Sequence, residues 1–285
     1  MCVQHFAAWI PARYALIHRW LTEVIATTDT HLHIVIATNA AREIALYFWK
    51  SMGYVPGVNR MNDFVDVELV DIGNDWCAKR KHAYYAPFVV MPFVFNVHSL
   101  TPPKGQQIDP LYSWNSMVDI KPKLTDVGAQ RDCLLFLSRG RSGRRSIENE
   151  DAMLQYLADF ASDHGLELVV HRGVHPDGFD AEKQRFSRAM IVVGPHSGAF
   201  GNMIFMQSGS FVVEFNGWLN DDFRAYYYAM AQANGLHYHY VAPQPFHYNK
   251  VMTVDMQHLH QVMAAVGESM FLSQSQLLSK TTSLK

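Results

Sequence analysis

The densest group of cationic side chains lies in the segment Arg139–Arg145, which holds four arginines within seven residues. It directly follows the apolar run Cys133–Ser138, which predicts a buried strand. Loops that follow the strands of a parallel sheet open at its carboxyl edge, where ligands bind. A planar guanidinium binds phosphate oxygens bidentately, so this segment predicts a diphosphate site. A solvent-exposed basic loop, or a short nucleic-acid patch, remains the alternative.

A second candidate is the turn Gly194–Asn202, between the apolar run Ala189–Gly194 and a predicted short helix. Small residues let the backbone approach a ligand, and the start of a helix offers free N–H groups and a positive dipole end. These features predict a phosphate cradle in which His196 donates to a phosphate or to a leaving oxygen. The segment matches neither the dinucleotide glycine fingerprint nor the P-loop. A tight turn with a structural histidine remains the alternative.

The third candidate is Glu214, an acid inside the apolar run Phe211–Phe215. A buried carboxylate needs a partner, and either a ribose diol or an ion pair with Arg224 would supply one. His237 and His239 alternate in the next predicted strand, which places them on one face. The chain contains no HExxH motif, no zinc-type ligand spacing, no DxD and no GxSxG.

The elements that would position these residues alternate regularly after Cys133. Apolar runs separated by helical segments predict a parallel sheet covered on both faces, and therefore a doubly wound α/β domain. The predicted strands are 133–138, 166–171, 189–194, 211–215 and 236–241, and the predicted helices are 148–164, 181–188, 222–234 and 255–272.

The first half of the chain repeats this pattern less clearly. Helices are predicted near 9–25 and 40–52, and strands at 31–38, 65–70 and 87–95. The proline- and glycine-rich region 100–110 predicts a linker. We therefore expect two α/β domains, one over residues 1–122 and one over 123–285.

The composition narrows the class of protein. Of the 285 residues, 49% are apolar and only 18% charged, which is too apolar for a disordered chain. A net charge of −2 provides no overall field for nucleic acid, which we do not expect as a partner. The three widely spaced cysteines fit a reducing compartment. No apolar run is long enough to span a membrane, so we expect a cytoplasmic protein as written, or a lumenal one if an N-terminal anchor was trimmed.

Several of these features follow one another in a recognisable order: an arginine-rich stretch ending in Asn-Glu, a Gln before an alanine-led strand, a Gly-x-His turn ending in Asn, and an apolar strand carrying Glu. The matching residues are Arg139, Arg141, Arg144, Arg145, Asn149, Glu150, Gln184, Ala189, Gly194, His196, Asn202 and Glu214. In this combination, residues 131–241 resemble glycosyltransferase family 61, which includes plant xylosyl- and arabinosyltransferases and animal O-linked N-acetylglucosaminyltransferases.

The resemblance is looser in the N-terminal half. His5, Pro11 and Arg13 are similar to the family's opening helix, but Ala7–Trp9 lie where the family usually has an acid. The turn also departs from the pattern, with Ser197 in place of a common Gly and Gly201 in place of Thr or Ser. The missing acid leaves the catalytic base open, with His5 and His98 as candidates.

The resemblance implies two facing Rossmann-like domains of the GT-B type with a nucleotide-sugar cleft between them. It further implies an inverting transfer from a UDP-sugar to a hydroxyl of a glycan or glycoprotein, without a metal or other cofactor. UDP-xylose is the first donor expected, and UDP-N-acetylglucosamine the second. The expected donor-binding residues are Arg139, Arg141, Arg144, Asn149, His171, His196, Ser197, Gly198, Ala199, Asn202 and Glu214.

The residues leave two other interpretations of the function open. The missing N-terminal acid suits a nucleotide-sugar- or carbohydrate-binding pseudoenzyme, which would bind UDP without transfer or donor hydrolysis. A dehydrogenase or a methyltransferase would share the Rossmann-like fold. The absence of a glycine fingerprint after any strand argues against that third reading.

Overall fold

A computed structural model describes residues 32–38, 65–71, 129–140, 145–173, 178–216, 226–244 and 251–282. The chain divides into two compact units, and each is described here by itself. The first comprises Met1–Val127, Gly198–Phe205 and Ala225–Asn234. The second comprises Gly128–Ser197, Met206–Arg224 and Gly235–Lys285. The expected boundary near residue 122 stays a prediction.

In the first unit, β1 (Leu32–Thr38) and β2 (Val65–Asp71) pair in parallel, with Leu32 opposite Val65 and Thr38 opposite Asp71. The predicted strands 31–38 and 65–70 are confirmed, whereas the elements predicted at 9–25, 40–52 and 87–95 lie outside the described residues. The same unit holds the 3₁₀-helix η2 (Gly198–Phe205) and α7 (Tyr226–Ala233), which pack together through the rings of Phe200 and Tyr227, 5.3 Å apart.

The second unit is built on a five-stranded parallel sheet with the order β4-β3-β5-β6-β7. Its strands are β3 (Cys133–Leu137), β4 (Glu167–His171), β5 (Ala189–Pro195), β6 (Phe211–Phe215) and β7 (His237–Val241). The central strands β3 and β6 are buried along their whole length, whereas the edge strands β4 and β7 are partly exposed. Because both faces of the central strands are buried, their sequences are almost continuously apolar. The predicted α/β class and parallel sheet are confirmed.

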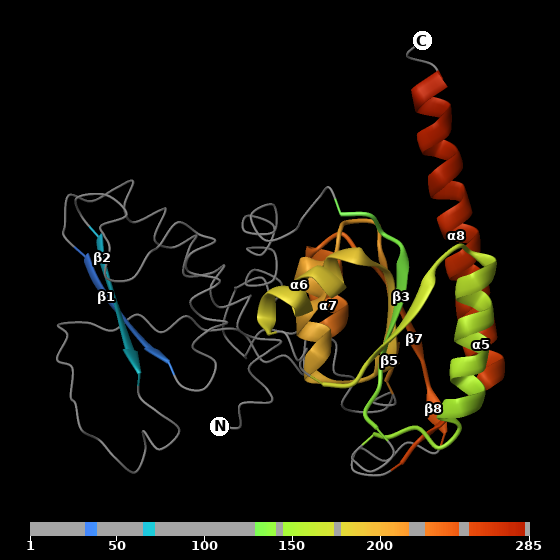
Figure 1. Ribbon diagram of the computed structural model, residues 1–285, viewed down its shortest axis with the longest axis horizontal. Coiled ribbons are helices and arrows are strands. Elements are labelled where there is room, and N and C mark those ends of the chain that lie inside the picture. The colour runs from blue at the N-terminus through green and yellow to red at the C-terminus, as the bar shows by residue number, and fades with distance from the viewer. Residues whose placement is uncertain are drawn as a thin grey trace, which may run out of the picture. The chain divides into compact units, whose positions relative to one another are not determined.

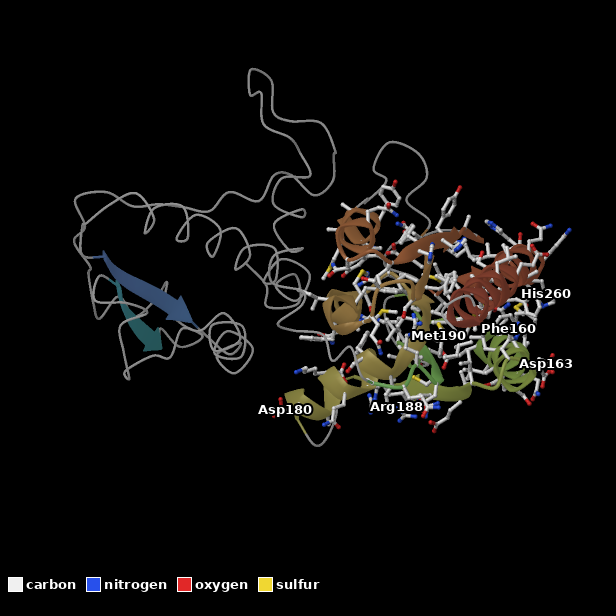
Figure 2. All side chains as sticks on the ribbon, turned by 90° about the horizontal axis from the view of Figure 1, so that it is seen from above. Phe160, Asp163, Asp180, Arg188, Met190 and His260 are labelled. Atoms are coloured by element: carbon white, nitrogen blue, oxygen red, sulfur yellow. The ribbon has the colours of Figure 1, made fainter. Side chains whose placement is uncertain are left out.

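Helices cover both faces of this sheet, as Figure 1 shows. The helices α5 (Glu150–Asp163) and α8 (Met256–Thr282) lie together on one face, and α6 (Phe179–Arg188) lies on the other. In Figure 2, Phe160 of α5 and His260 of α8 are accordingly close to each other and far from Asp180 of α6.

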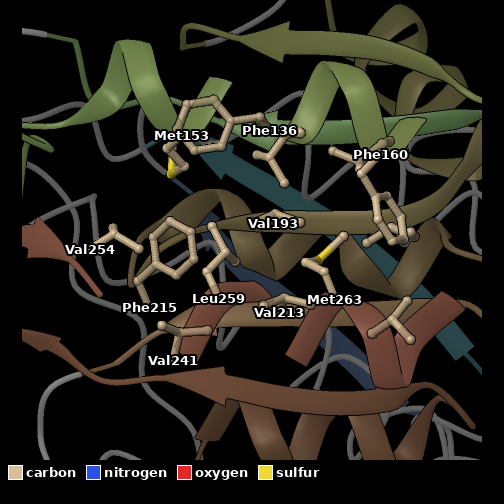
Figure 3. Close-up of a cluster of buried hydrophobic side chains, with 14 of the residues drawn as sticks. Phe136, Met153, Phe160, Val193, Val213, Phe215, Val241, Val254, Leu259 and Met263 are labelled. Carbon is tan, nitrogen blue, oxygen red and sulfur yellow. The ribbon is translucent and has the colours of Figure 1, made fainter. Parts of the chain in front are cut away.

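The hydrophobic core fills the space between the sheet and the α5/α8 pair (Figure 3). Alternate strand residues such as Phe136, Val193 and Val213 point into it, because successive side chains of a strand face opposite sides. Met153 of α5 and Met263 of α8 close it from the helical side. The opposite strand faces are also buried, and Glu214 lies among those residues with none of its surface exposed.

Three features differ from the sequence-based expectations. The segment after the Gly194 turn is a 3₁₀-helix rather than a regular helix, and α8 continues to Thr282. A short antiparallel pair, β8 (Pro243–Gln244) with β9 (Thr253–Val254), was not expected. Strands of two residues carry too little sequence pattern to be predicted.

Within the part of the chain that the structure describes, no helix is both long and apolar enough to cross a membrane.

Candidate functional site

The site lies at the carboxyl edge of the five-stranded sheet, where its winding changes direction. The chain passes from β3 to β4 on one side and then returns to β5 on the other side of β3. Such a switch point between β3 and β5 is where open α/β sheets bind ligands. The residues directly beyond these two strands are Ser138 and Arg139 on one side and His196 and Ser197 on the other.

The close approach of β3 and β5 depends on a glycine. A Cβ atom at Gly194 would lie 2.8 Å from Cβ of Leu137 and 2.9 Å from its carbonyl oxygen. Because one of these atoms belongs to the backbone, no side-chain rearrangement relieves the contact. The glycine that begins the predicted cradle is therefore required by the packing of the two strands.

Beyond β3, Ser138 fixes the start of the arginine-rich loop. Its hydroxyl donates to Oε1 of Glu150 at 3.0 Å and accepts from the backbone N–H of Gly140 at 3.1 Å. Glu150 is buried in the first turn of α5, where the helix dipole favours a carboxylate. Its Oε2 has no hydrogen-bond partner among the described residues. Arg139, the first residue of that loop, is exposed to solvent.

Arg145 joins the end of that loop to the turn after β5. Its Nη1 donates to the carbonyl oxygen of His196. Its backbone has φ of 67°, a left-handed conformation uncommon for residues other than glycine. The hydrogen bond therefore connects Arg145 to the turn that follows β5.

Asn149 connects the start of α5 to the end of β9. Its Oδ1 accepts from the N–H of Val254 and its Nδ2 donates to the carbonyl of Val254, both at 2.9 Å. A neighbouring parallel bridge between Ile147 and Met252 extends this pairing. Although Asn149 stands at the N-cap position, its side chain makes no cap bond. Both of its polar groups serve the fold.

Beyond β5, His196 belongs to a buried polar network. Its Nδ1 hydrogen-bonds Oε1 of Glu214, and the phenol of Tyr238 donates to Oε2 of Glu214 at 2.5 Å. The side chains of His196 and Glu214 are 3% and 0% exposed. Burial and the adjacent Glu214 carboxylate raise the pKa of the Tyr238 phenol, so Tyr238 keeps its proton and acts as a donor.

A second buried pair lies at the carboxyl end of β4, an outer strand of the same sheet. His171, the last residue of β4, contacts Oε1 of Glu182 through Nε2 at 2.6 Å. Arg185 lies 3.5 Å from the other oxygen of Glu182. The arrangement orients the His171 ring through a carboxylate, as in the His196 pair.

The family model of glycosyltransferase 61 matches residues 20–213, which is more than half of the chain. The chain belongs to the glycosyltransferase 61 family. A search of curated proteins gives no match. Family membership supports a glycosyltransferase activity, with a sugar donor and a glycan acceptor.

The structure places the expected donor-binding residues of this glycosyltransferase 61 chain in three groups. Arg139, Asn149, His171, His196, Ser197 and Glu214 lie in the second unit. Gly198, Ala199 and Asn202 lie in η2, whose chain begins directly after Ser197. The expected donor-binding residues Arg141 and Arg144 lie outside the described residues. The candidate bases His5 and His98, and Arg224, the alternative partner of Glu214, also lie outside them. The donor-binding and catalytic roles stay predictions.

Within the second unit, the structure brings the expected residues together only in part. His196 and Glu214 contact each other directly, whereas Asn149 contacts the backbone of Val254. Among the described residues no group of His, Cys, Asp and Glu side chains has the arrangement of a metal site.

Two residues that hydrogen-bond within the site were not predicted from the sequence: Glu182, the partner of His171, and Tyr238, which donates to Glu214. Tyr238 lies two positions before Tyr240, which stands opposite Glu214 in the β6–β7 register, so its ring lies on the same sheet face. Knowledge of this β6–β7 register would have placed Tyr238 near Glu214. The register itself was not predictable from alternation alone.

Proposed function

We propose that the protein is an inverting glycosyltransferase that transfers a sugar from a UDP-sugar to a hydroxyl of a glycan or glycoprotein. UDP-xylose is the first donor proposed, and UDP-N-acetylglucosamine the second. The observation that supports this most directly is the switch point, where Arg139 follows β3 and His196 follows β5 within a chain of the glycosyltransferase 61 family.

The reaction requires charge compensation at the leaving group. The acceptor oxygen attacks the anomeric carbon while the bond from that carbon to the diphosphate oxygen breaks, and a base takes the acceptor proton. Negative charge grows on the departing UDP, and cationic or N–H donors placed beforehand stabilise it. Arg139 and His196 are the described side chains proposed for this task. Such donors would make a divalent metal unnecessary.

The remaining parts of the proposal rest on the family resemblance. These are the arrangement of two facing Rossmann-like domains and a catalytic base from the N-terminal half, with His5 and His98 as candidates. Arg141, Arg144 and the N–H groups of residues 198–202 are further proposed donor contacts.

The test combines ligand binding with turnover. Thermal unfolding is measured with UDP, UDP-xylose, UDP-N-acetylglucosamine, GDP, NAD and S-adenosylmethionine, each with and without EDTA. A ligand at 100 times its Kd stabilises the folded state by about 2.7 kcal/mol, which gives a clear shift. We expect stabilisation by UDP and one UDP-sugar, unchanged by EDTA, and release of UDP from that sugar in the presence of acceptor glycans.

Variants then locate the site. Arg139→Ala and His196→Ala are expected to abolish transfer while leaving the protein folded. Arg131→Ala is the matched control, since Arg131 precedes the same strand at its amino end, where Nη1 donates to the carbonyl of Ser208 at 3.2 Å. Wild-type turnover in both site variants would exclude this donor site. UDP binding without transfer or donor hydrolysis would identify a binding protein, and a response to NAD or S-adenosylmethionine alone would overturn the proposal.

A further inference from the structure

We propose that Glu214 and Tyr238 are positioning residues that hold the His196 ring with Nδ1 protonated, so that His196 acts on the donor diphosphate through Nε2. This inference rests on the proposed function, in which His196 touches the donor. It assigns Glu214 to the histidine rather than to the ribose of the donor.

The first step is the geometry of the carboxylate. Oε1 of Glu214 meets Nδ1 of His196, and Oε2 accepts from the Tyr238 phenol at 2.5 Å. Both oxygens of the carboxylate thus have a protein group opposite them. Glu214 also has none of its surface exposed, so neither oxygen is open to a ribose diol.

The second step concerns the protons. Burial and Glu214 raise the pKa of Tyr238, so the phenol remains protonated and donates to Oε2. An ionised carboxylate only accepts hydrogen bonds, and its remaining partner Nδ1 must then carry a proton. A ring whose Nδ1–H is committed to a carboxylate has its tautomer and its orientation determined, and it acts on other groups through Nε2.

The third step is the anchoring of the backbone that carries the ring. The N–H of His196 donates to the carbonyl of Phe215 at 3.2 Å, and its carbonyl accepts from Arg145. The ring and its main chain are therefore held from β6, from β7 and from the end of the arginine-rich loop. Such support keeps a reacting group within the narrow tolerance that catalysis requires.

The burial of Glu214 indicates that the network of His196, Glu214 and Tyr238 does more than stabilise the sheet. Glu214 lies in a central strand with no exposed surface, where its neighbours in β6 are Val213 and Phe215. Replacing a buried ion pair by apolar residues of similar volume is often neutral or stabilising. A carboxylate in this strand, hydrogen-bonded directly to His196 at the ligand edge, therefore fits a role in orienting that ring.

The decisive variants exploit the difference between a carboxylate and an amide. In Glu214→Gln, a Tyr238 phenol that continues to donate requires the amide oxygen on its side. The amide NH₂ then faces the ring, and Nδ1 becomes an acceptor, which moves the ring proton to Nε2. In Glu214→Gln/Tyr238→Phe, the amide is released from this constraint and its oxygen can again accept from Nδ1–H.

Nitrogen-15 NMR of the histidine rings reads the tautomer directly, with His196→Gln used to assign the signal. We expect the Nδ1–H form in the wild type, the Nε2–H form in Glu214→Gln, and the Nδ1–H form again in the double variant. The kcat of Glu214→Gln should fall, by up to the factor of about 10⁴ seen when a catalytic histidine is held in the wrong tautomer, with a smaller change in donor KM. The double variant should regain part of this loss, which a merely structural pair would not do.

Glu167→Gln, an exposed carboxylate paired with Arg188 at the amino end of β4, is the control and should leave turnover unchanged. An unchanged kcat in Glu214→Gln would overturn the inference, and so would a loss of kcat with the wild-type tautomer retained. If the wild type neither binds UDP nor turns over a donor, the proposed function fails instead, while the NMR signal still reports whether Glu214 sets the tautomer.

Discussion

At the scale of single residues, a polar side chain in a motif can serve either a ligand or the fold, and its contacts distinguish the two. Asn149 belongs to the Asn-Glu pair that resembles glycosyltransferase 61, yet both of its polar groups bind the backbone of Val254. Glu214 instead contacts a neighbouring candidate residue, His196. The first arrangement stabilises a strand end, and the second organises the candidate site.

We therefore expect Asn149→Asp to act on stability. Aspartate retains an acceptor for the N–H of Val254 but replaces the donor to its carbonyl by a negatively charged oxygen. Leaving that carbonyl unsatisfied costs about 1–3 kcal/mol in the free energy of unfolding, which urea denaturation measures. Thr253→Ala, which removes an exposed contact to Glu148, should cost far less. Wild-type stability combined with a raised donor KM in Asn149→Asp would instead place Asn149 in the donor site.

At the scale of elements, the sheet of the second unit was largely predictable and its side-chain network was not. Apolar runs such as Cys133–Leu137 and Phe211–Phe215 identify central strands, because both faces of those strands are buried. The contact of Tyr238 with Glu214 depends on the register between β6 and β7 and on side-chain rotamers. Neither is encoded in the local pattern of one strand. The alternation of strands and helices predicted a ligand site at the carboxyl edge of the sheet, whereas the switch point between β3 and β5 was identified only from the strand order.

In the edge strand β7, the alternation of side chains places two histidines in the same surroundings. His237 and His239 were expected on one face, and both rings stack on Phe211, at centroid distances of 4.8 and 6.4 Å. Burial lowers the pKa of His239 below its ordinary value, and the neighbouring His237 adds to this effect. The neutral ring is thus the form that the folded sheet accommodates.

This shift predicts a loss of stability on acidification. Between the lowered folded-state pKa and the ordinary value near 6.5, the unfolded chain binds the additional proton, so stability decreases as the pH falls through that range. Below the range both states are protonated, and the contribution of His239 no longer changes with pH. His239→Phe should make the free energy of unfolding less dependent on pH below the ordinary histidine pKa of about 6.5. His237→Phe should have a smaller effect in the same direction, because it removes only the second cause. Parallel stability curves for wild type and His239→Phe would contradict the assignment.

At the scale of the whole molecule, the sheet that carries the candidate site also contains a buried cysteine whose reactivity reports on opening of the fold. Cys133 begins β3 with 1% of its surface exposed, and burial raises the pKa of its thiol to about 12. A buried, protonated thiol is unreactive until the surrounding structure opens. The site begins only a few residues further along the same strand, at Ser138 and Arg139. Opening of β3 should therefore release the ligand and expose the thiol together.

We expect bound UDP to protect Cys133 from a thiol reagent. With Cys2→Ser and Cys77→Ser, the remaining thiol should react much more slowly in the native protein than in urea, and the ratio of rates gives the opening equilibrium. UDP at 100 times its Kd should slow the native reaction about 100-fold, because it binds only the closed form. GDP at the same concentration is the control for nucleotide specificity. UDP that binds without slowing the reaction would show that the nucleotide site does not depend on the sheet that begins at Cys133.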